Sequence, residues 1–233
     1  MTSPELTPEE ILQGLYDDTL VGNAPHVLEL THQGLELDME PQTLLFDALI
    51  PSLEEVGARF ERGDFFVPEM LIAGRAMAGA MEVLRPLLAE TGAETIGKFL
   101  MGTVKGDVHD IGKNLVNIML EGAGFEVIDL GVQVPPEKFV AAIEEHQPDI
   151  VGFSAFLTTT MPMFKANMNA LEKSGVRDSV IVMVGGAPVT QEYADAVGAD
   201  GYAPDASACV KKAKALIKDR RSKVRHEREL AGT

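Results

Sequence analysis

The first 92 residues carry apolar positions at helical spacing and almost no strand pattern. In one segment, apolar residues recur mostly every three or four positions and form a single apolar helical face. They are Leu45, Ala48, Leu49, Leu53 and Val56. Prolines typical of a first helical turn open four such segments, at Pro8, Pro25, Pro41 and Pro68. The pattern predicts an antiparallel four-helix bundle over residues 1–92.

After Gly92, apolar runs typical of buried parallel strands alternate with amphipathic stretches. The runs cover residues 96–104, 125–130, 150–154, 180–184 and 201–203. Helix candidates start near Gly112, Pro136, Thr160, Thr190 and Asp205. Five strand–helix units predict an α/β domain over residues 93–219, a flavodoxin- or Rossmann-like doubly wound sheet of five parallel strands. Such sheets bind ligands outside the carboxyl ends of their strands, which directs attention to the loops there.

Composition narrows the class of protein. The chain is 45% hydrophobic and 24% charged, which is ordinary for a globular protein. No apolar run approaches a membrane span, and the acidic N-terminus lacks a signal-peptide pattern. The single cysteine, Cys209, excludes an intramolecular disulfide and a cysteine-cluster metal site. A reducing cytoplasm is therefore the expected compartment.

The net charge of −16 is unevenly distributed. Residues 1–92 hold 17 acidic and 4 basic side chains, and residues 93–210 hold 16 and 7. Residues 211–233 reverse the balance, with 3 and 9. An acidic body repels nucleic acid and anionic lipid, so neither is expected as a partner. The basic end predicts a final helix and a solvated tail over residues 220–233, although RNA binding is the alternative.

The loop after the first predicted strand contains the clearest chemical signal. His109 stands between Asp107 and Asp110 in a glycine-punctuated stretch. A neutral imidazole is a good transition-metal ligand, and a nearby carboxylate can fix its tautomer and raise its basicity. Gly112 is expected to let the backbone pack closely where the next helix begins. The alternative interpretation is a surface loop with an incidental histidine.

The loops after the third and fourth strands carry weaker signals. Ser154 and the run of threonines at 158–160 place four hydroxyl groups where a strand gives way to a helix. Helix capping would explain Thr159 or Thr160 but not Ser154. Gly185-Gly186 would let a ligand approach the backbone closely, or would simply form a tight turn.

Taken together, these motifs resemble the cobalamin-binding domain of corrinoid proteins. The resemblance rests on Asp-x-His-x-x-Gly after the first strand, the hydroxyl cluster after the third and Gly-Gly after the fourth. The helical N-terminal segment resembles the cap module of the methyl-carrying members. The similarity is closest to the stand-alone corrinoid proteins of methylamine, methanol, glycine betaine and aryl methyl ether methyltransferase systems. A related module occurs in cobalamin-dependent methionine synthase.

The resemblance implies a role for each matching residue. His109 would be the lower axial ligand of cobalt in place of the cofactor's dimethylbenzimidazole. Asp107 would hydrogen-bond His109 and couple ligation to proton uptake, and Thr160 would continue this relay. Further contacts with the cofactor or its displaced nucleotide tail would come from Val108, Asp110, Ile111, Gly112, Ser154, Phe156, Leu157, Thr158, Gly185, Gly186, Tyr202 and Ala203. One departure concerns Phe156, which stands where the family's Ser-x-Leu pattern has leucine.

The fourth predicted helix resembles the cap helix that covers the upper face of the corrin. Phe66, Met70 and Leu71 are the expected cofactor contacts in this segment, and an apolar lid would exclude water from reactive cobalt. The alternative is packing alone, since methionine and leucine at helical spacing usually form bundle core. Thr91-Gly92-Ala93 is the expected hinge for lid opening.

The implied function is that of a methyl carrier rather than an enzyme acting alone. A substrate-specific methyltransferase would methylate Co(I), and a second methyltransferase would pass the methyl group from methyl-Co(III) to tetrahydrofolate or coenzyme M. A reductive activating protein is a further expected partner. A cobalamin-dependent sensor, a subunit of an adenosylcobalamin mutase and a receiver domain are the alternatives. A sensor would be expected to carry a DNA-binding module, a mutase subunit to act with a substrate barrel, and a receiver domain to have an acidic phosphoacceptor. None of these features is expected here, which argues against each alternative.

Overall fold

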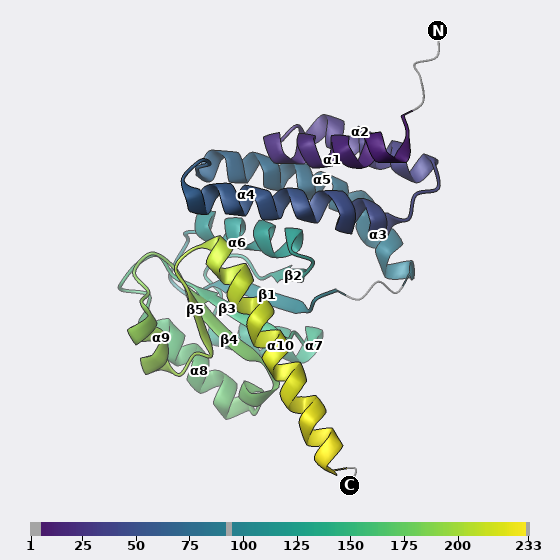
Figure 1. Ribbon diagram of the computed structural model, residues 1–233. Coiled ribbons are helices and arrows are strands. Elements are labelled where there is room, and N and C mark those ends of the chain that lie inside the picture. The colour runs from purple at the N-terminus through teal and green to yellow at the C-terminus, as the bar shows by residue number, and fades with distance from the viewer. Residues whose placement is uncertain (1–5, 92–94, 232–233) are drawn as a thin grey trace. The chain divides into compact units, whose positions relative to one another are not determined.

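The computed structural model describes residues 6–91 and 95–231 and forms two compact units (Figure 1). One comprises residues 1–94 with the short stretch 121–124, and the other comprises the rest of the chain. The predicted hinge at Thr91-Gly92-Ala93 falls largely outside the described residues.

The N-terminal unit is helical, as the apolar spacing predicts. Its elements are α1 (Pro8–Val21), α2 (Ala24–Glu36), α3 (Pro41–Leu44), the π-helical segment η1 (Leu45–Leu49), α4 (Ile50–Arg62) and α5 (Val67–Thr91). A capping box joins Thr7 and Glu10 at the start of α1. Gly22 and Gly63 end α1 and α4 in the left-handed conformation that favours glycine. We refer to this unit as the cap.

The third predicted helix contains a π-helical segment that the apolar spacing does not reveal. The π segment η1 joins α3 to α4 and ends two residues before Pro51. Proline lacks an amide proton and clashes with the carbonyl four residues earlier, so an extra residue in the preceding turn relieves both problems. The helix therefore continues through Pro51 instead of ending there.

The second unit contains the predicted alternation of strands and helices. Its elements are β1 (Lys98–Thr103), α6 (Ile111–Gly122), β2 (Glu126–Asp129), α7 (Pro136–His146), β3 (Ile150–Ser154), α8 (Pro162–Ser174), the 3₁₀ turn η2 (Arg177–Ser179), β4 (Ile181–Gly185), α9 (Gln191–Val197), β5 (Gly201–Ala203) and α10 (Ala206–Ala231). The five parallel strands have the order β2-β1-β3-β4-β5. This confirms the predicted doubly wound α/β fold, and the strand order reverses between β1 and β3.

Helices cover both faces of the sheet. Helices α7, α8 and α9 share one hydrophobic core with residues from every second position of β3 and β4, including Phe153, Val182 and Val184. The opposite face receives α10, since the backbone of Gly201 lies against Leu216 and that of Gly97 against Ile217. Right-handed crossovers place α6 on this same face.

The C-terminal basic segment differs from the expected tail. Helix α10 runs through residue 220 to Ala231 without interruption. Arg220 donates hydrogen bonds to the backbone carbonyls of Asp149 and Ser179, and Arg221 donates to that of Ile96. These carbonyls precede β3, β4 and β1, so the two arginines bind the amino edge of the sheet. The solvated tail predicted from residue 220 therefore begins within a docked helix.

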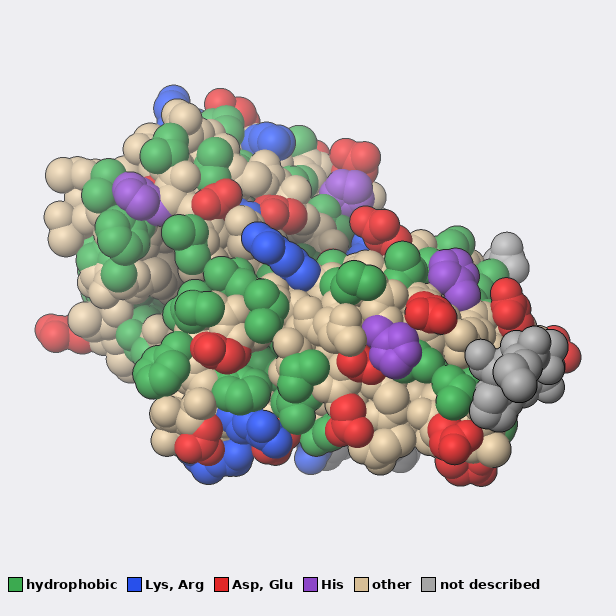
Figure 2. Space-filling model, turned by 90° about the horizontal axis from the view of Figure 1, so that it is seen from above, with side chains coloured by type: hydrophobic (Ala, Val, Ile, Leu, Met, Phe, Trp, Pro, Cys, Tyr) green, Lys and Arg blue, Asp and Glu red, His purple; other side chains and the backbone are tan. Residues whose placement is uncertain are grey.

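Charged side chains are scattered over the face shown in Figure 2. Acidic side chains there lie among apolar, uncharged and basic ones and do not form one continuous patch. Among the described residues, no helix has both the length and the apolar character needed to cross a membrane.

Candidate cobalamin site

The predicted site residues converge at the carboxyl edge of the sheet. The register places Thr103, Ser154, Gly185 and Ala203 in one row across β1, β3, β4 and β5. The loop with His109 follows Thr103, at the point where the strand order reverses. Parallel sheets bind their ligands at such a point, so the topology brings together loops that are about fifty residues apart in sequence.

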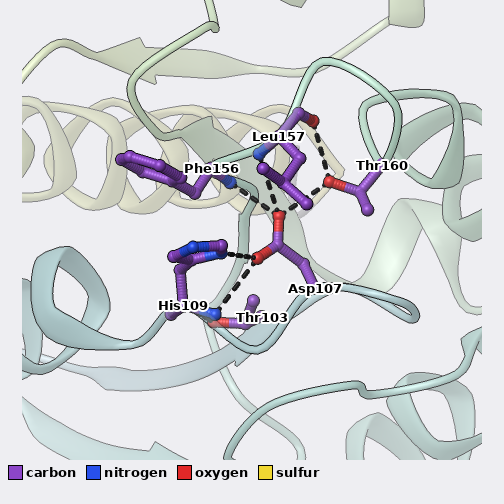
Figure 3. A network of polar contacts seen from close by, with 6 residues as sticks. All are labelled: Thr103, Asp107, His109, Phe156, Leu157 and Thr160. Carbon is purple, nitrogen blue, oxygen red and sulfur yellow. Dashed lines mark hydrogen bonds and ion pairs between the residues drawn. The ribbon is translucent and has the colours of Figure 1, made fainter.

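Asp107 and His109 form a hydrogen-bonded pair in the loop after β1 (Figure 3). Asp107 Oδ1 lies 2.7 Å from His109 Nδ1 and also accepts the backbone N–H of His109 at 3.1 Å. Gly106, with φ of 84°, makes the turn that leads into the pair. Because Nδ1 is directed at the carboxylate, Nε2 is the ring nitrogen left for a metal.

The other carboxylate oxygen binds the loop after β3. Asp107 Oδ2 accepts the backbone N–H groups of Phe156 and Leu157 at 2.8 and 3.1 Å. The Thr160 hydroxyl lies 2.7 Å from the same oxygen and 2.8 Å from the Leu157 carbonyl. The Leu157 carbonyl already accepts the backbone N–H of Thr160. The single proton of the Thr160 hydroxyl is therefore assigned to the hydrogen bond with Asp107.

This network determines the ionisation state of Asp107. The side chain is fully buried, and burial alone would raise its pKa. Hydrogen bonds from Thr160, His109 and the Phe156 and Leu157 amides outweigh that effect and hold the pKa well below its ordinary value. Asp107 is therefore a carboxylate at neutral pH, able to accept a proton-bearing Nδ1.

The imidazole itself is partly open to solvent. The His109 side chain is 43% exposed, whereas Asp107 beneath it is inaccessible. The Thr103 hydroxyl donates to the His109 carbonyl at 3.0 Å and secures the loop from the strand below. The Phe156 ring stacks on the imidazole, with centroids 4.3 Å apart and planes inclined by 30°.

Large apolar side chains around His109 are unusually exposed. Val108, Ile111, Phe156 and Leu157 have 58, 68, 53 and 38% of their surface accessible. Val108 and Ile111 lie in the loop of the Asp107–His109 pair and at the start of α6, and Phe156 and Leu157 lie in the loop after β3 that binds Asp107. Exposed apolar surface of this kind marks a binding site, and here it surrounds a potential metal ligand.

The glycines near the site have different structural roles. A Cβ at Gly186, where φ is 127°, would lie 1.8 Å from the Ala155 carbonyl oxygen. Gly186 therefore lets the β4 loop pack against the β3 loop, which supports the tight-turn interpretation. A Cβ at Gly112 would meet no atom within 4 Å. Apart from the first turn of α6 itself, open space therefore borders Gly112.

Two other predicted site residues, Tyr202 and Met70, pack against the hydrophobic interior of the two units. Tyr202 packs against the core shared by α7, α8 and α9, on the opposite face of the sheet from Ser154 and Ala203. In the cap, Met70 is only 1% exposed, as the packing alternative predicts, while Leu71 is half-buried and Phe66 is 64% exposed. Cofactor contact by Tyr202 and by Met70 stays a prediction.

An ion pair between a buried lysine and an exposed aspartate lies close to the loop and was not predicted from the sequence. Lys113 in the first turn of α6 is 2% exposed, and its ammonium group binds Asp129 at the end of β2. It also donates to the Asn114 side chain. The only sequence signal for this pair is that Lys113 stands among apolar positions of the helix. Its partner, Asp129, lies 16 residues away and cannot be identified from residue spacing.

His109 is the residue best suited to hold a metal. Among the residues that the structure describes, no group of three or more His, Cys, Asp or Glu could hold an ion. Burial raises the pKa of the Cys209 thiol to about 12, so it stays protonated. A site with one protein ligand fits a metal whose other ligands come from a macrocycle.

Comparisons with known proteins agree with this interpretation. Two family models, each described as a B12 binding domain, match residues 97–211 and residues 11–85. The fold and site therefore define a cobalamin-binding protein.

Its relatives are more specific. The chain is 41% identical over 213 residues to the dimethylamine corrinoid protein of Methanosarcina barkeri, covering 91% of this chain and all of that protein. A cobalamin-binding protein from Desulfitobacterium hafniense DCB-2 aligns with a TM-score of 0.68 and 32% identity, covering 88% of this chain and 96% of that one. The methanol:cobalamin methyltransferase complex MtaBC from Methanosarcina barkeri aligns with a TM-score of 0.79 and 29% identity, covering 93 and 86%. The chain belongs to the family of corrinoid proteins of methyltransferase systems.

Proposed function

We propose that this protein is the methyl-carrying subunit of a methylated-amine methyltransferase system. A substrate-specific methyltransferase would deliver the methyl group, and a second methyltransferase would pass it to tetrahydrofolate or coenzyme M. A reductive activating protein would return the carrier to its reduced, active state. When bound, cobalamin supplies the cobalt atom that accepts and gives up the methyl group. The observation that carries this proposal is the Asp107–His109 pair with its free Nε2.

The residues of this chain would hold and orient the group. His109 would bind cobalt as the lower axial ligand through Nε2. Asp107 accepts the Nδ1 proton, which fixes the tautomer and leaves Nε2 as the ligand atom, and Thr160 holds the carboxylate in place. A change in ligation would then be coupled to the proton that His109 and Asp107 share.

Other residues would contact the remainder of the cofactor. The exposed positions Val108, Asp110 and Leu157 in the two loops, with Ile111 and Gly112 at the start of α6, would lie against the corrin. Ser154, Gly185 and Ala203 share one row of the sheet, and with Thr158 they would contact the displaced nucleotide tail. Gly186 would hold that row indirectly, through the Ala155 backbone. In the cap, Phe66 and Leu71 would cover the upper face and exclude water.

The test is reconstitution followed by methyl transfer. The protein would be loaded with cobalamin without oxygen, reduced, and mixed with isotope-labelled dimethylamine and a dimethylamine methyltransferase. We expect label in the protein-bound fraction and its release when an acceptor methyltransferase is added. Methanol or a betaine, each with its own methyltransferase, would serve as control donors. Failure of the protein to bind cobalamin would overturn the proposal, and labelling only by another donor would overturn the amine assignment.

Replacing Gly112 with alanine should weaken cobalamin binding without damaging the fold. The new methyl group meets no protein atom and adds helix propensity, so the free energy of unfolding should stay equal or rise by up to about 1 kcal/mol. Gly186→Ala is the matched comparison. It should lower the free energy of unfolding by about 2–4 kcal/mol because of the clash with Ala155 and the positive φ. Urea denaturation and equilibrium dialysis of cobalamin measure the two effects. Full affinity in Gly112→Ala would contradict the placement of the cofactor over this loop.

A further inference from the structure

Phe156 has two separate contacts with the Asp107–His109 pair. Its backbone N–H donates to Asp107 Oδ2 at 2.8 Å, and its ring stacks on the imidazole of His109 at 4.3 Å between centroids (Figure 3). The residue comes from the loop after β3, while the pair belongs to the loop after β1. One residue of the neighbouring loop thus touches both members of the pair.

The hydrogen bond from Asp107 does not fix the imidazole by itself. A single Nδ1–Oδ1 contact sets the direction of one ring atom, but the ring can still tilt about that contact. The side chain of His109 is 43% exposed, so protein packing constrains it only partly. A ligand atom such as Nε2 must keep its direction to bind a metal well.

The stacked phenyl ring supplies the missing constraint. Ring planes inclined by 30° at 4.3 Å place the phenyl over one face of the imidazole, where tilting would lose contact. The phenyl also keeps water from that face of the ring and so strengthens the adjacent Nδ1–Oδ1 hydrogen bond. A leucine at this position would keep the backbone contact with Asp107 but offer no flat surface to the ring.

We propose that Phe156 is a positioning residue that holds the plane of the His109 imidazole and so directs Nε2 toward its metal. The proposal rests on the proposed function, since it takes His109 as the cobalt ligand. It assigns the Phe156 side chain a task separate from contact with the nucleotide tail. The aromatic residue in place of the family's leucine would make this chain's ligand more rigid.

The first test uses the protein without cofactor. In NMR spectra of the apoprotein with labelled histidine, the stacked ring should shift the His109 side-chain protons upfield. Phe156→Leu should remove this shift, and Phe156→Tyr should retain it. Phe46→Leu, which removes an exposed phenylalanine of the cap, is the matched control. His109 signals unchanged in Phe156→Leu would overturn the stacking.

The second test asks whether the stack matters for ligation. Phe156→Leu should weaken cobalamin binding about two- to tenfold, the range expected for loss of one aromatic pair. The visible spectrum of its holoprotein should move toward that of His109→Ala, and Phe156→Tyr should restore both properties. Wild-type affinity and spectrum in Phe156→Leu, with both changed in His109→Ala, would overturn this proposal alone. No change in His109→Ala would instead contradict the ligand role of His109.

Discussion

Replacing His109 with alanine is expected to change the visible spectrum of the cobalamin-loaded protein to that of a form without a histidine ligand. Affinity for cobalamin should fall by at least about 10–100-fold, since loss of residues that merely support a metal ligand already costs that much. The free energy of unfolding of the apoprotein should fall by only about 1 kcal/mol. Asp107 keeps its hydrogen bond from the backbone N–H of residue 109 and its three contacts with the loop after β3. Spectroscopy, equilibrium dialysis and urea denaturation give the three quantities.

The matched control is His146→Ala at the end of α7, where a partly exposed histidine lies 3.9 Å from Glu145. It should leave the spectrum and the affinity unchanged. An unchanged spectrum in His109→Ala would refute the assignment of the axial ligand.

Replacing Asp107 with asparagine should lower the free energy of unfolding by about 2–4 kcal/mol at pH 7. The buried carboxylate accepts five hydrogen bonds, and an amide would turn its NH₂ group toward donors of the protein. Asp110→Asn, three residues later and exposed, should have little effect on stability. Equal stability of Asp107→Asn and wild type would mean that the network contributes nothing to the fold.

The same substitution predicts a dependence on pH with a definite sign. The pKa of Asp107 is lower in the folded protein than its unfolded value of about 4, so folding favours the ionised form. Its contribution to stability is fully present above pH of about 4 and is lost as pH falls toward the folded pKa. The gap between wild type and Asp107→Asn should therefore shrink in urea denaturations performed below pH of about 4. A gap that widened there would contradict the assigned ionisation.

Most of the fold could be predicted because each element has a strong local signal. All five strands and the starts of the helices between them lie within two residues of their predicted positions. The π-helical segment before Pro51 was missed because apolar spacing alone does not distinguish a π turn from an α turn. The full length of α10 could not be predicted because a run of basic residues usually indicates solvent exposure, whereas Arg220 and Arg221 bind backbone carbonyls.

The site could be predicted in its residues more than in its contacts. Asp107, His109 and Thr160 were named from sequence, yet the sharing of one carboxylate between two loops depends on strand order. Tyr202 and Ala203 face opposite sides of the sheet, as neighbours in a strand do, so only Ala203 shares a face with Ser154. The stacking of Phe156 on His109 could not be predicted from residue spacing, because the two residues are 47 positions apart in the sequence.

The double attachment of Asp107 has a consequence for the order of folding. Its two oxygens bind loops that come together only after β3 has paired with β1 across the intervening β2 and α7. Such long-range pairing forms late, because the chain must first close a large loop. A nascent or partly folded chain therefore lacks an organised histidine, and uptake of cobalamin during refolding should lag behind helix formation and coincide with completion of the sheet.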